Sequence, residues 1–201
     1  NEFSQQERTL LLEIAREAIT NAVQGLPLPT LNLESMPPAL QKEGASIVTL
    51  TIAGRLRGCI GTLQAYQPLA KDVQEHAVAA AMEDYRFSPL RKDELSEIEI
   101  EVSCLTPAVN LPYDHPEQLP DLLTPHEDGV VLQDGYHRAT FLPQVWDQLP
   151  VPSEFLTHLC LKMGVPGQTW QHKVLDVSIY HVEEFSEKQQ DETPSEDPPL
   201  S

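Results

Sequence analysis

The feature that most constrains this chain is the alternation of apolar and polar residues in the stretch "EIEIEVSC", residues 97–104. Ile98, Ile100 and Val102 alternate there with three glutamates and a serine. This period of two is typical of a β-strand that buries one face and exposes the other. The stretch is therefore predicted as a half-buried strand with an acidic outer face.

Helical stripes and hairpin signals are mixed along the rest of the chain. Asp134-Gly135, between two β-rich runs, is the strongest short hairpin signal. No regular alternation of strands and helices is present, so we predict the α+β class, with a largely antiparallel sheet flanked by helices. The predicted elements are helices over residues 4–25, 68–82 and 152–164, hairpins over 45–63 and 128–142, and a final strand over 173–185.

Composition and charge exclude several classes of function. The 201 residues carry a formal charge of -18, which opposes binding to a phosphate backbone, so we predict no nucleic-acid partner. No apolar run reaches the roughly 20 residues that span a bilayer, so no membrane association is predicted either. The first residues do not read as a secretory signal. We expect an acidic, cytoplasmic protein.

The chain has three widely spaced cysteines and no paired Cys-x-x-Cys motif, which favours a reducing compartment over a disulfide framework. The histidines lack the short spacings of a zinc or iron site, so no metal is predicted. No glycine-rich phosphate loop is present, and no cofactor is predicted.

The stretch "LRGCIGTL", residues 56–63, is the strongest candidate for a functional site. On a regular strand Arg57 and Cys59 would share a face about 6–7 Å apart, so that the guanidinium could favour the thiolate or hold an anion. Gly58 and Gly61 would let a ligand or another backbone approach closely. The alternative is that Cys59 is a buried cysteine and that the glycines mark a bulge.

Several motifs together resemble the AMMECR domain family, which includes protein A of the bacterial AmmeMemoRadiSam system. They follow one another in the order of the family from about residue 8 to residue 185. Tyr85 departs from the family, which has proline at this position. The motifs are "LRGCIGTL", "AAAMEDYRFSPL", "IEIEVSCLTP", "DGVVLQDGYHRATFLPQVW", and "EFLTHLCLKMG" with the following Trp170.

The resemblance implies a single domain over residues 1–185, built from two unequal lobes with a cleft near the R-G-C-I-G segment. The polar residues 186–201 are predicted to form a disordered acidic tail. The resemblance also suggests a Memo-like protein and a radical S-adenosylmethionine enzyme as partners. It implies no particular reaction.

Other motif positions supply candidate site residues. Glu101 and Ser103 lie on the polar face of their strand, and Glu101 could orient Arg57 or Arg86, or form a structural salt bridge between the lobes. His137 could serve as a base for Cys59, or be an ordinary surface histidine. The predicted catalytic residues are Cys59, Arg57, Glu101 and His137, and the predicted substrate-binding residues are Gly58, Gly61, Arg86, Ser103 and Gln144.

Two classes of function follow from these residues. The first is an enzyme that acts on a small molecule, which could be anionic, with Cys59 as a nucleophile or redox thiol. The second is a non-catalytic module that binds a ligand or a peptide of one of the two suggested partners. In the second, Cys59 only packs.

Overall fold

The computed structural model describes residues 2–191, and its chain divides into two compact units. The first contains residues up to Leu105 and again from Glu183, and the second contains residues 106–182. Each unit has its own sheet and its own apolar core. The α+β class with antiparallel sheets is confirmed, although there are two sheets. The lobes and cleft inferred from the resemblance stay predictions.

The first unit is built on a four-stranded sheet in the order β2-β1-β3-β8. The predicted acidic strand is β3, which pairs antiparallel with β1, while β1 and β2 form the predicted hairpin. The elements of this unit are α1 (Gln5–Val23), the 3-10 turn η1 (Leu33–Ser35), α2 (Pro38–Gln41), β1 (Ala45–Ile52), β2 (Arg55–Gly61), α3 (Leu69–Met82), η2 (Lys92–Glu94), β3 (Ile98–Leu105), β8 (Val182–Ser186) and α7 (Glu187–Asp191).

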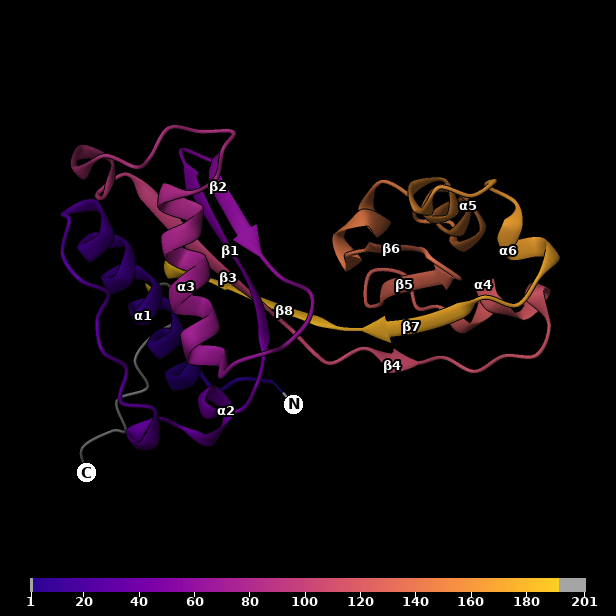
Figure 1. The fold of residues 1–201 in the computed structure, drawn as a ribbon, viewed down its shortest axis with the longest axis horizontal. Helices are drawn as coiled ribbons and strands as arrows, with labels where there is room; N and C mark the ends of the chain where they lie inside the picture. Colours follow the sequence, from indigo (N-terminus) through magenta and orange to yellow (C-terminus); the bar gives the residue numbers. More distant parts are fainter. Residues whose placement is uncertain (1, 192–201) are drawn as a thin grey trace, which may run out of the picture. The chain divides into compact units, whose positions relative to one another are not determined.

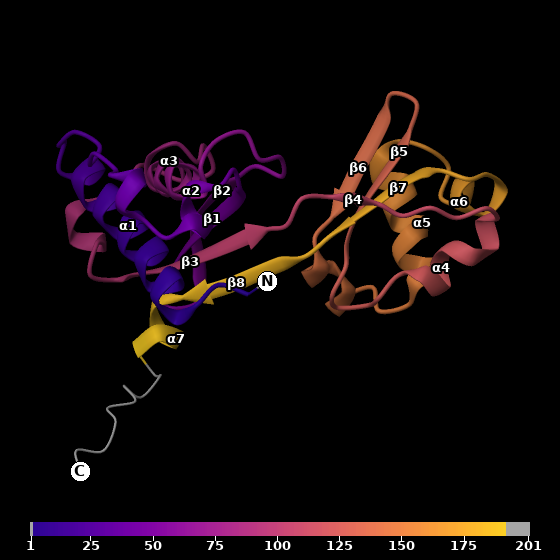
Figure 2. The same cartoon turned by 90° about the horizontal axis from the view of Figure 1, so that it is seen from below.

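Helices α1 and α3 pack against each other and cover one face of this sheet (Figures 1 and 2). The side chains of Val48, Leu50, Ile100 and Val102 point into the core beneath the helices. Since side chains alternate along a strand, the residues between them lie on the other face. We call that other face of the first sheet the open face.

The second unit is built on a sheet in the order β4-β7-β5-β6. Helix α5 packs on β5 and β6, and Trp146 stacks on Phe155 with the ring centroids 3.7 Å apart. The elements of this unit are β4 (Val109–Asn110), η3 (Pro116–Gln118), α4 (Leu119–Leu122), β5 (Gly129–Asp134), β6 (His137–Phe141), η4 (Pro143–Asp147), α5 (Pro152–Met163), α6 (Thr169–His172) and β7 (Asp176–Tyr180). No helix within residues 2–191 is both long and apolar enough to cross a membrane.

The single strand predicted over residues 173–185 is wrong, because the segment forms two strands in different sheets. Strand β7 belongs to the second unit and β8 to the first sheet, and His181 separates them. The backbone N–H of His181 donates to the Thr106 hydroxyl at 2.8 Å. A local pattern of β-branched residues does not reveal such a change of sheet, since both halves alternate in the same way.

The first residues of the predicted tail, 186–191, have regular structure. Ser186 is buried in β8, and Glu187 starts α7. The Glu187 carboxylate accepts hydrogen bonds from the Arg16 guanidinium, the shortest at 2.6 Å, and from the backbone N–H of Ile100 at 2.9 Å. Residues 186–191 therefore belong to the first unit. The remainder of the predicted tail, residues 192–201, lies outside the described residues.

Candidate functional site

Strand β2 carries most of the predicted site and contains a β-bulge. Gly58 lies opposite Leu50 of β1, but the next pair joins Leu56 to Thr51, so Arg57 is an extra residue between the two pairs. A bulge interrupts the alternation of side chains along a strand. The regular geometry that predicted a shared face for Arg57 and Cys59 is therefore absent at this point.

Arg57 pairs with Glu94 of η2. Its Nε donates to Glu94 Oε2 at 2.8 Å and its Nη2 donates to Oε1 at 3.0 Å, with both side chains almost completely buried. These hydrogen bonds hold the pKa of Glu94 at about 2. The remaining nitrogen, Nη1, is buried without a hydrogen-bond partner. The guanidinium predicted to activate the thiol is thus engaged by a carboxylate.

The Cys59 thiol lies on the open face. Its sulfur is 3.3 Å from the hydroxyl oxygen of Thr49, the residue directly opposite it in β1. Thr49 lies between Val48 and Leu50, which both point into the core, so its side chain projects away from the helices. Cys59 is partly exposed, whereas Cys104 and Cys160 are buried. Of the three cysteines, Cys59 is therefore the one that is partly exposed.

Glu101 completes a row of three polar side chains across the open face. It lies opposite Thr49 on the side away from Cys59, so the order across the strands is Cys59, Thr49, Glu101. Burial raises the pKa of the Glu101 carboxyl, and the charges of Glu184 and Glu99 raise it further. A carboxyl in this environment holds its proton to a higher pH than an ordinary glutamate.

The other predicted polar residues of the first unit are Ser103 and Arg86. Ser103 is buried on the same strand face as Glu101, opposite Ile47. Arg86 is exposed and pairs with Asp84 at 2.7 Å. Neither Arg57 nor Arg86 pairs with Glu101, because each guanidinium is bound to another carboxylate. The alternative of a Glu101 salt bridge to either arginine is therefore not realised.

The two glycines of the motif allow close packing of the protein's own backbone. A Cβ on Gly58 would lie 2.1 Å from the carbonyl oxygen of Ala80 in α3, and one on Gly61 would lie 2.5 Å from the carbonyl oxygen of Ser46. The space that the prediction reserved for a ligand at Gly58 is thus occupied by α3. The glycines were expected to allow the close approach of either a ligand or another backbone, and the structure shows the approach of another backbone.

His137 and Gln144 belong to the second unit, whereas all the residues above belong to the first. His137 begins β6 and is exposed, with its ring 3.5 Å from the position of a Cβ on Gly164. Gln144 is exposed in η4. The role of His137 as a base for Cys59 stays a prediction.

Sequence reasoning missed a buried polar network beneath the covered face of the first sheet. The Ser46 hydroxyl donates to Asp72 Oδ2 at 2.6 Å, and His76 Nδ1 lies 3.1 Å from the same oxygen. Gln67 Nε2 donates to Asp72 Oδ1 at 3.1 Å. Burial alone would raise the pKa of Asp72, but the hydrogen bonds from His76, Ser46 and Gln67 outweigh it and lower the value. The available signal was a pair of polar residues, Asp72 and His76, four positions apart in a helix with an apolar face.

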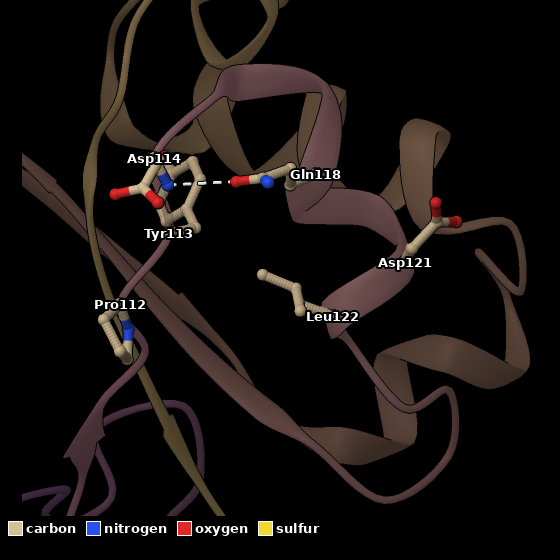
Figure 3. Close-up of a pocket in the computed structure, with 6 residues that line it drawn as sticks. All are labelled: Pro112, Tyr113, Asp114, Gln118, Asp121 and Leu122. Atoms are coloured by element: carbon tan, nitrogen blue, oxygen red, sulfur yellow. Dashed lines mark hydrogen bonds between the residues drawn. The ribbon is translucent and has the colours of Figure 1, made fainter.

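One hollow of the second unit lies away from all predicted residues. Its volume is about 390 Å³, and Pro112, Tyr113 and Leu122 supply its apolar wall (Figure 3). Two carboxylates and the amide of Gln118 complete it; Gln118 accepts a hydrogen bond from the backbone N–H of Asp114 at 3.0 Å. Within residues 2–191, no group of three or more histidine, cysteine or acidic side chains is arranged to hold a metal.

Comparisons with other proteins show related chains across almost the whole length. A protein of Thermofilum pendens is 35% identical over 200 residues, and the match covers 92% of both chains. Protein MJ0810 of Methanocaldococcus jannaschii is 32% identical over 189 residues, and the match covers 90% of each chain. The crystal structure of the uncharacterized protein PH0010 from Pyrococcus horikoshii has a TM-score of 0.78 at 28% identity, and the match covers 92% of this chain and 94% of that one. The model of the AMMECR1 family matches residues 12–185, and the chain therefore belongs to the AMMECR1 family.

Proposed function

We propose that the protein is an enzyme that acts on a small molecule at the open face, with Cys59 as its nucleophile. The observation that carries this proposal is that Cys59 is partly exposed and that its sulfur lies 3.3 Å from the Thr49 hydroxyl. A hydroxyl that donates to sulfur stabilises the thiolate, which is the reactive form. A reducing compartment such as the cytoplasm would keep this thiol available, and we propose it as the place of action.

Glu101 is the proposed proton donor and acceptor for the reaction. Neighbouring strands are about 4.8 Å apart, so the Cα atoms of Cys59 and Glu101 are roughly 10 Å apart across Thr49. A small substrate on this face could contact both side chains. Because its pKa is raised, the Glu101 carboxyl is better suited than an ordinary glutamate to exchange a proton near neutral pH.

The test compares the reactivity of the three cysteines in the full-length protein. Iodoacetamide at neutral pH should alkylate Cys59 at least about tenfold faster than Cys104 or Cys160, because burial raises the pKa of both other thiols. Peptide mass spectrometry at timed intervals gives the three rates. If the three cysteines are alkylated at equal rates, and only when the protein unfolds, Cys59 is eliminated as a nucleophile.

A second candidate function is a non-catalytic binding module, and Arg57 favours it. Because its guanidinium is bound to Glu94, the cation expected to activate the thiol is already engaged. In this version the open face binds a ligand or a peptide of a Memo-like protein or a radical S-adenosylmethionine enzyme. Cys59→Ser separates the two candidates, since it should abolish turnover of a substrate but leave binding to such a partner unchanged.

A further inference from the structure

A tight turn after α3 fixes the Arg86 side chain to the strand that carries Cys59. Asp84 lies in this turn and is 5% exposed. One of its oxygens accepts from the backbone N–H of Arg86 at 3.2 Å and from Arg86 Nε at 3.0 Å. The other accepts from Arg86 Nη2 at 2.7 Å and from the backbone N–H of Cys59 at 3.0 Å. A single buried carboxylate thus connects the guanidinium to the Cys59 backbone.

The turn itself is closed by backbone and side-chain hydrogen bonds. The N–H of Phe87 donates to the carbonyl oxygen of Asp84 at 3.0 Å, and the carboxylate of Asp84 binds the N–H two residues ahead, as in an Asx-turn. Tyr85, which replaces the proline typical of the family, projects into solvent with 95% of its surface exposed. The hydrogen bonds of the Asp84 side chain thus restrict the turn in this chain, which lacks the proline ring that would do so in other family members.

Arg86 keeps free hydrogen-bonding capacity on the surface. Its side chain is 47% exposed, and its Nε and Nη2 both donate hydrogen bonds to Asp84. No residue in the described part of the chain accepts a hydrogen bond from Nη1. The Cζ atom of Arg86 lies 5.5 Å from the centre of the Phe87 ring, and that of Arg57 lies 5.9 Å from it. Stacking on Phe87 and the Asp84 pair restrict the guanidinium before any ligand arrives.

Arg86 is linked to Cys59 through Asp84. The pKa of Arg86 is raised mainly by its hydrogen bond to Asp84, and Cys59 is a minor contributor to the same shift. The chain as a whole carries 31 acidic residues against 13 lysines and arginines. A fixed, half-exposed guanidinium joined through Asp84 to the Cys59 backbone is therefore a local positive charge on a strongly acidic chain.

We propose that Arg86 recognises an oxyanion group of the molecule on which Cys59 acts, so that the substrate class is a small electrophile that carries a carboxylate or phosphate. Asp84 is the positioning residue for Arg86. This inference rests on the proposed function, since it assumes that Cys59 is the reacting group. A half-exposed, fixed and planar guanidinium, with Nε and Nη2 bonded to Asp84, can still donate from Nη1 to an oxyanion.

The experiment uses two alkylating reagents that differ only in charge. Iodoacetate and iodoacetamide react in the same way: the Cys59 thiol loses its proton to solvent, its sulfur bonds to the methylene carbon, and iodide leaves. The ratio of the two rates at Cys59 in the full chain measures the preference for an anion. Arg86→Gln should lower this ratio about two- to fivefold, the effect of one partly exposed charge.

Two variants control for other effects of the substitution. Arg91→Gln removes an exposed arginine that is likewise paired with a carboxylate, at 3.1 Å from Asp93, and should leave the ratio unchanged. Arg86→Lys keeps the charge but not the two-point bond to Asp84, and should give an intermediate ratio. In a second measurement on the unmodified protein, inorganic phosphate should slow the iodoacetamide reaction of Cys59.

The outcomes separate this inference from the function beneath it. If Cys59 reacts no faster than the buried cysteines with either reagent, the proposed function itself fails. If Cys59 is reactive but Arg86→Gln has the same ratio as the unmodified protein, or if phosphate gives no protection, the role of Arg86 is overturned while the nucleophile stands. A ratio that falls equally in Arg91→Gln would also overturn it, because only the overall charge would matter.

Discussion

The two faces of the first sheet carry the same pair of functional groups in opposite surroundings. On the covered face Cys104 lies opposite Ser46 of β1, and on the open face Cys59 lies opposite Thr49 of the same strand. Each pair has a carboxylate in its vicinity, Asp72 on the covered side and Glu101 on the open side. The sequence thus places a thiol, a hydroxyl and a carboxyl on both faces.

The groups on the covered face and those on the open face differ in their exposure to water. Asp72, Ser46 and His76 are almost completely buried and satisfy one another's hydrogen bonds, while burial raises the pKa of Cys104. The open face has a partly exposed thiol and a carboxyl that accepts no hydrogen bond in the described structure. The covered groups are therefore enclosed in the core and bonded to one another, whereas the open-face thiol and carboxyl belong to partly exposed residues.

The largest expected effect comes from breaking the covered network. Asp72→Ala leaves the Ser46 hydroxyl, the His76 ring and the Gln67 amide without their shared acceptor inside the core. We expect the free energy of unfolding to fall by about 3 kcal/mol, as measured by urea denaturation. Asp93→Ala, which removes an exposed carboxylate, should change it by less than about 0.5 kcal/mol. A similar small loss for both variants would show that the network contributes little stability.

A smaller effect should distinguish two adjacent residues of β2. Gly58→Ala places a methyl group 2.1 Å from the Ala80 carbonyl oxygen, so α3 must shift, and the expected loss is about 2 kcal/mol. Cys59→Ala on the open face removes a partly exposed thiol and should cost less than about 1 kcal/mol. Thermal unfolding of both variants checks this order. The reverse order would mean that Cys59 packs more tightly than Gly58.

The sequence predicted the elements of the first unit well because they are local. The helix predicted over residues 4–25, the alternation in β3 and the hairpin predicted over residues 45–63 depend on neighbouring residues. The division into two sheets at His181 was missed, since it depends on pairing partners far away along the chain. The regular structure of residues 186–191 was missed for the same reason: Glu187 is held by Arg16, which is 171 positions earlier.

The role of Cys59 stays a prediction, and the structure surrounds this residue with other groups than the sequence suggested. The open face follows from alternation, and a bulge marked by the glycines was one of the alternatives, but alternation alone does not show that the bulge falls at Arg57. Spacing in the sequence therefore suggested Arg57 as the cation for the thiol, whereas the structure engages Arg57 with Glu94 and ties Arg86 to the Cys59 backbone through Asp84. Side-chain partners that come from separate turns cannot be read from the spacing within one strand.

The pH dependence of stability should have opposite signs on the two faces. The pKa of Asp72 is lowered from its ordinary 3.8, so the network adds stability above that pH and loses it as the pH falls through the lower folded value. The pKa of Glu101 is raised from 4.5, so its contribution is present at low pH and is lost as the pH rises through the folded value. The free energy of unfolding, measured from acid to neutral pH, tests both.

Two neutral variants isolate these contributions. Asp72→Asn should flatten the acid limb of the curve. Glu101→Gln should be neutral below about pH 4 and should stabilise the protein by about 0.5 kcal/mol at pH 7, because it removes a partly desolvated charge near Glu184 and Glu99. If Glu101→Gln destabilises the protein at pH 7, the carboxylate has a favourable partner there and its proposed role in proton transfer loses its basis.

The smallest expected effect concerns the hydroxyl that separates the two open-face groups. Thr49→Val keeps the shape of the side chain and removes the oxygen that lies 3.3 Å from the Cys59 sulfur. The thiolate then loses one donor, so iodoacetamide should alkylate Cys59 about two- to fivefold more slowly. Thr51→Val is the matched control, since Thr51 lies opposite Leu56 and should leave the rate unchanged. An unaltered rate in Thr49→Val would mean that Thr49 only packs against the sulfur, and the open face would then resemble the covered face in chemistry as well as in composition.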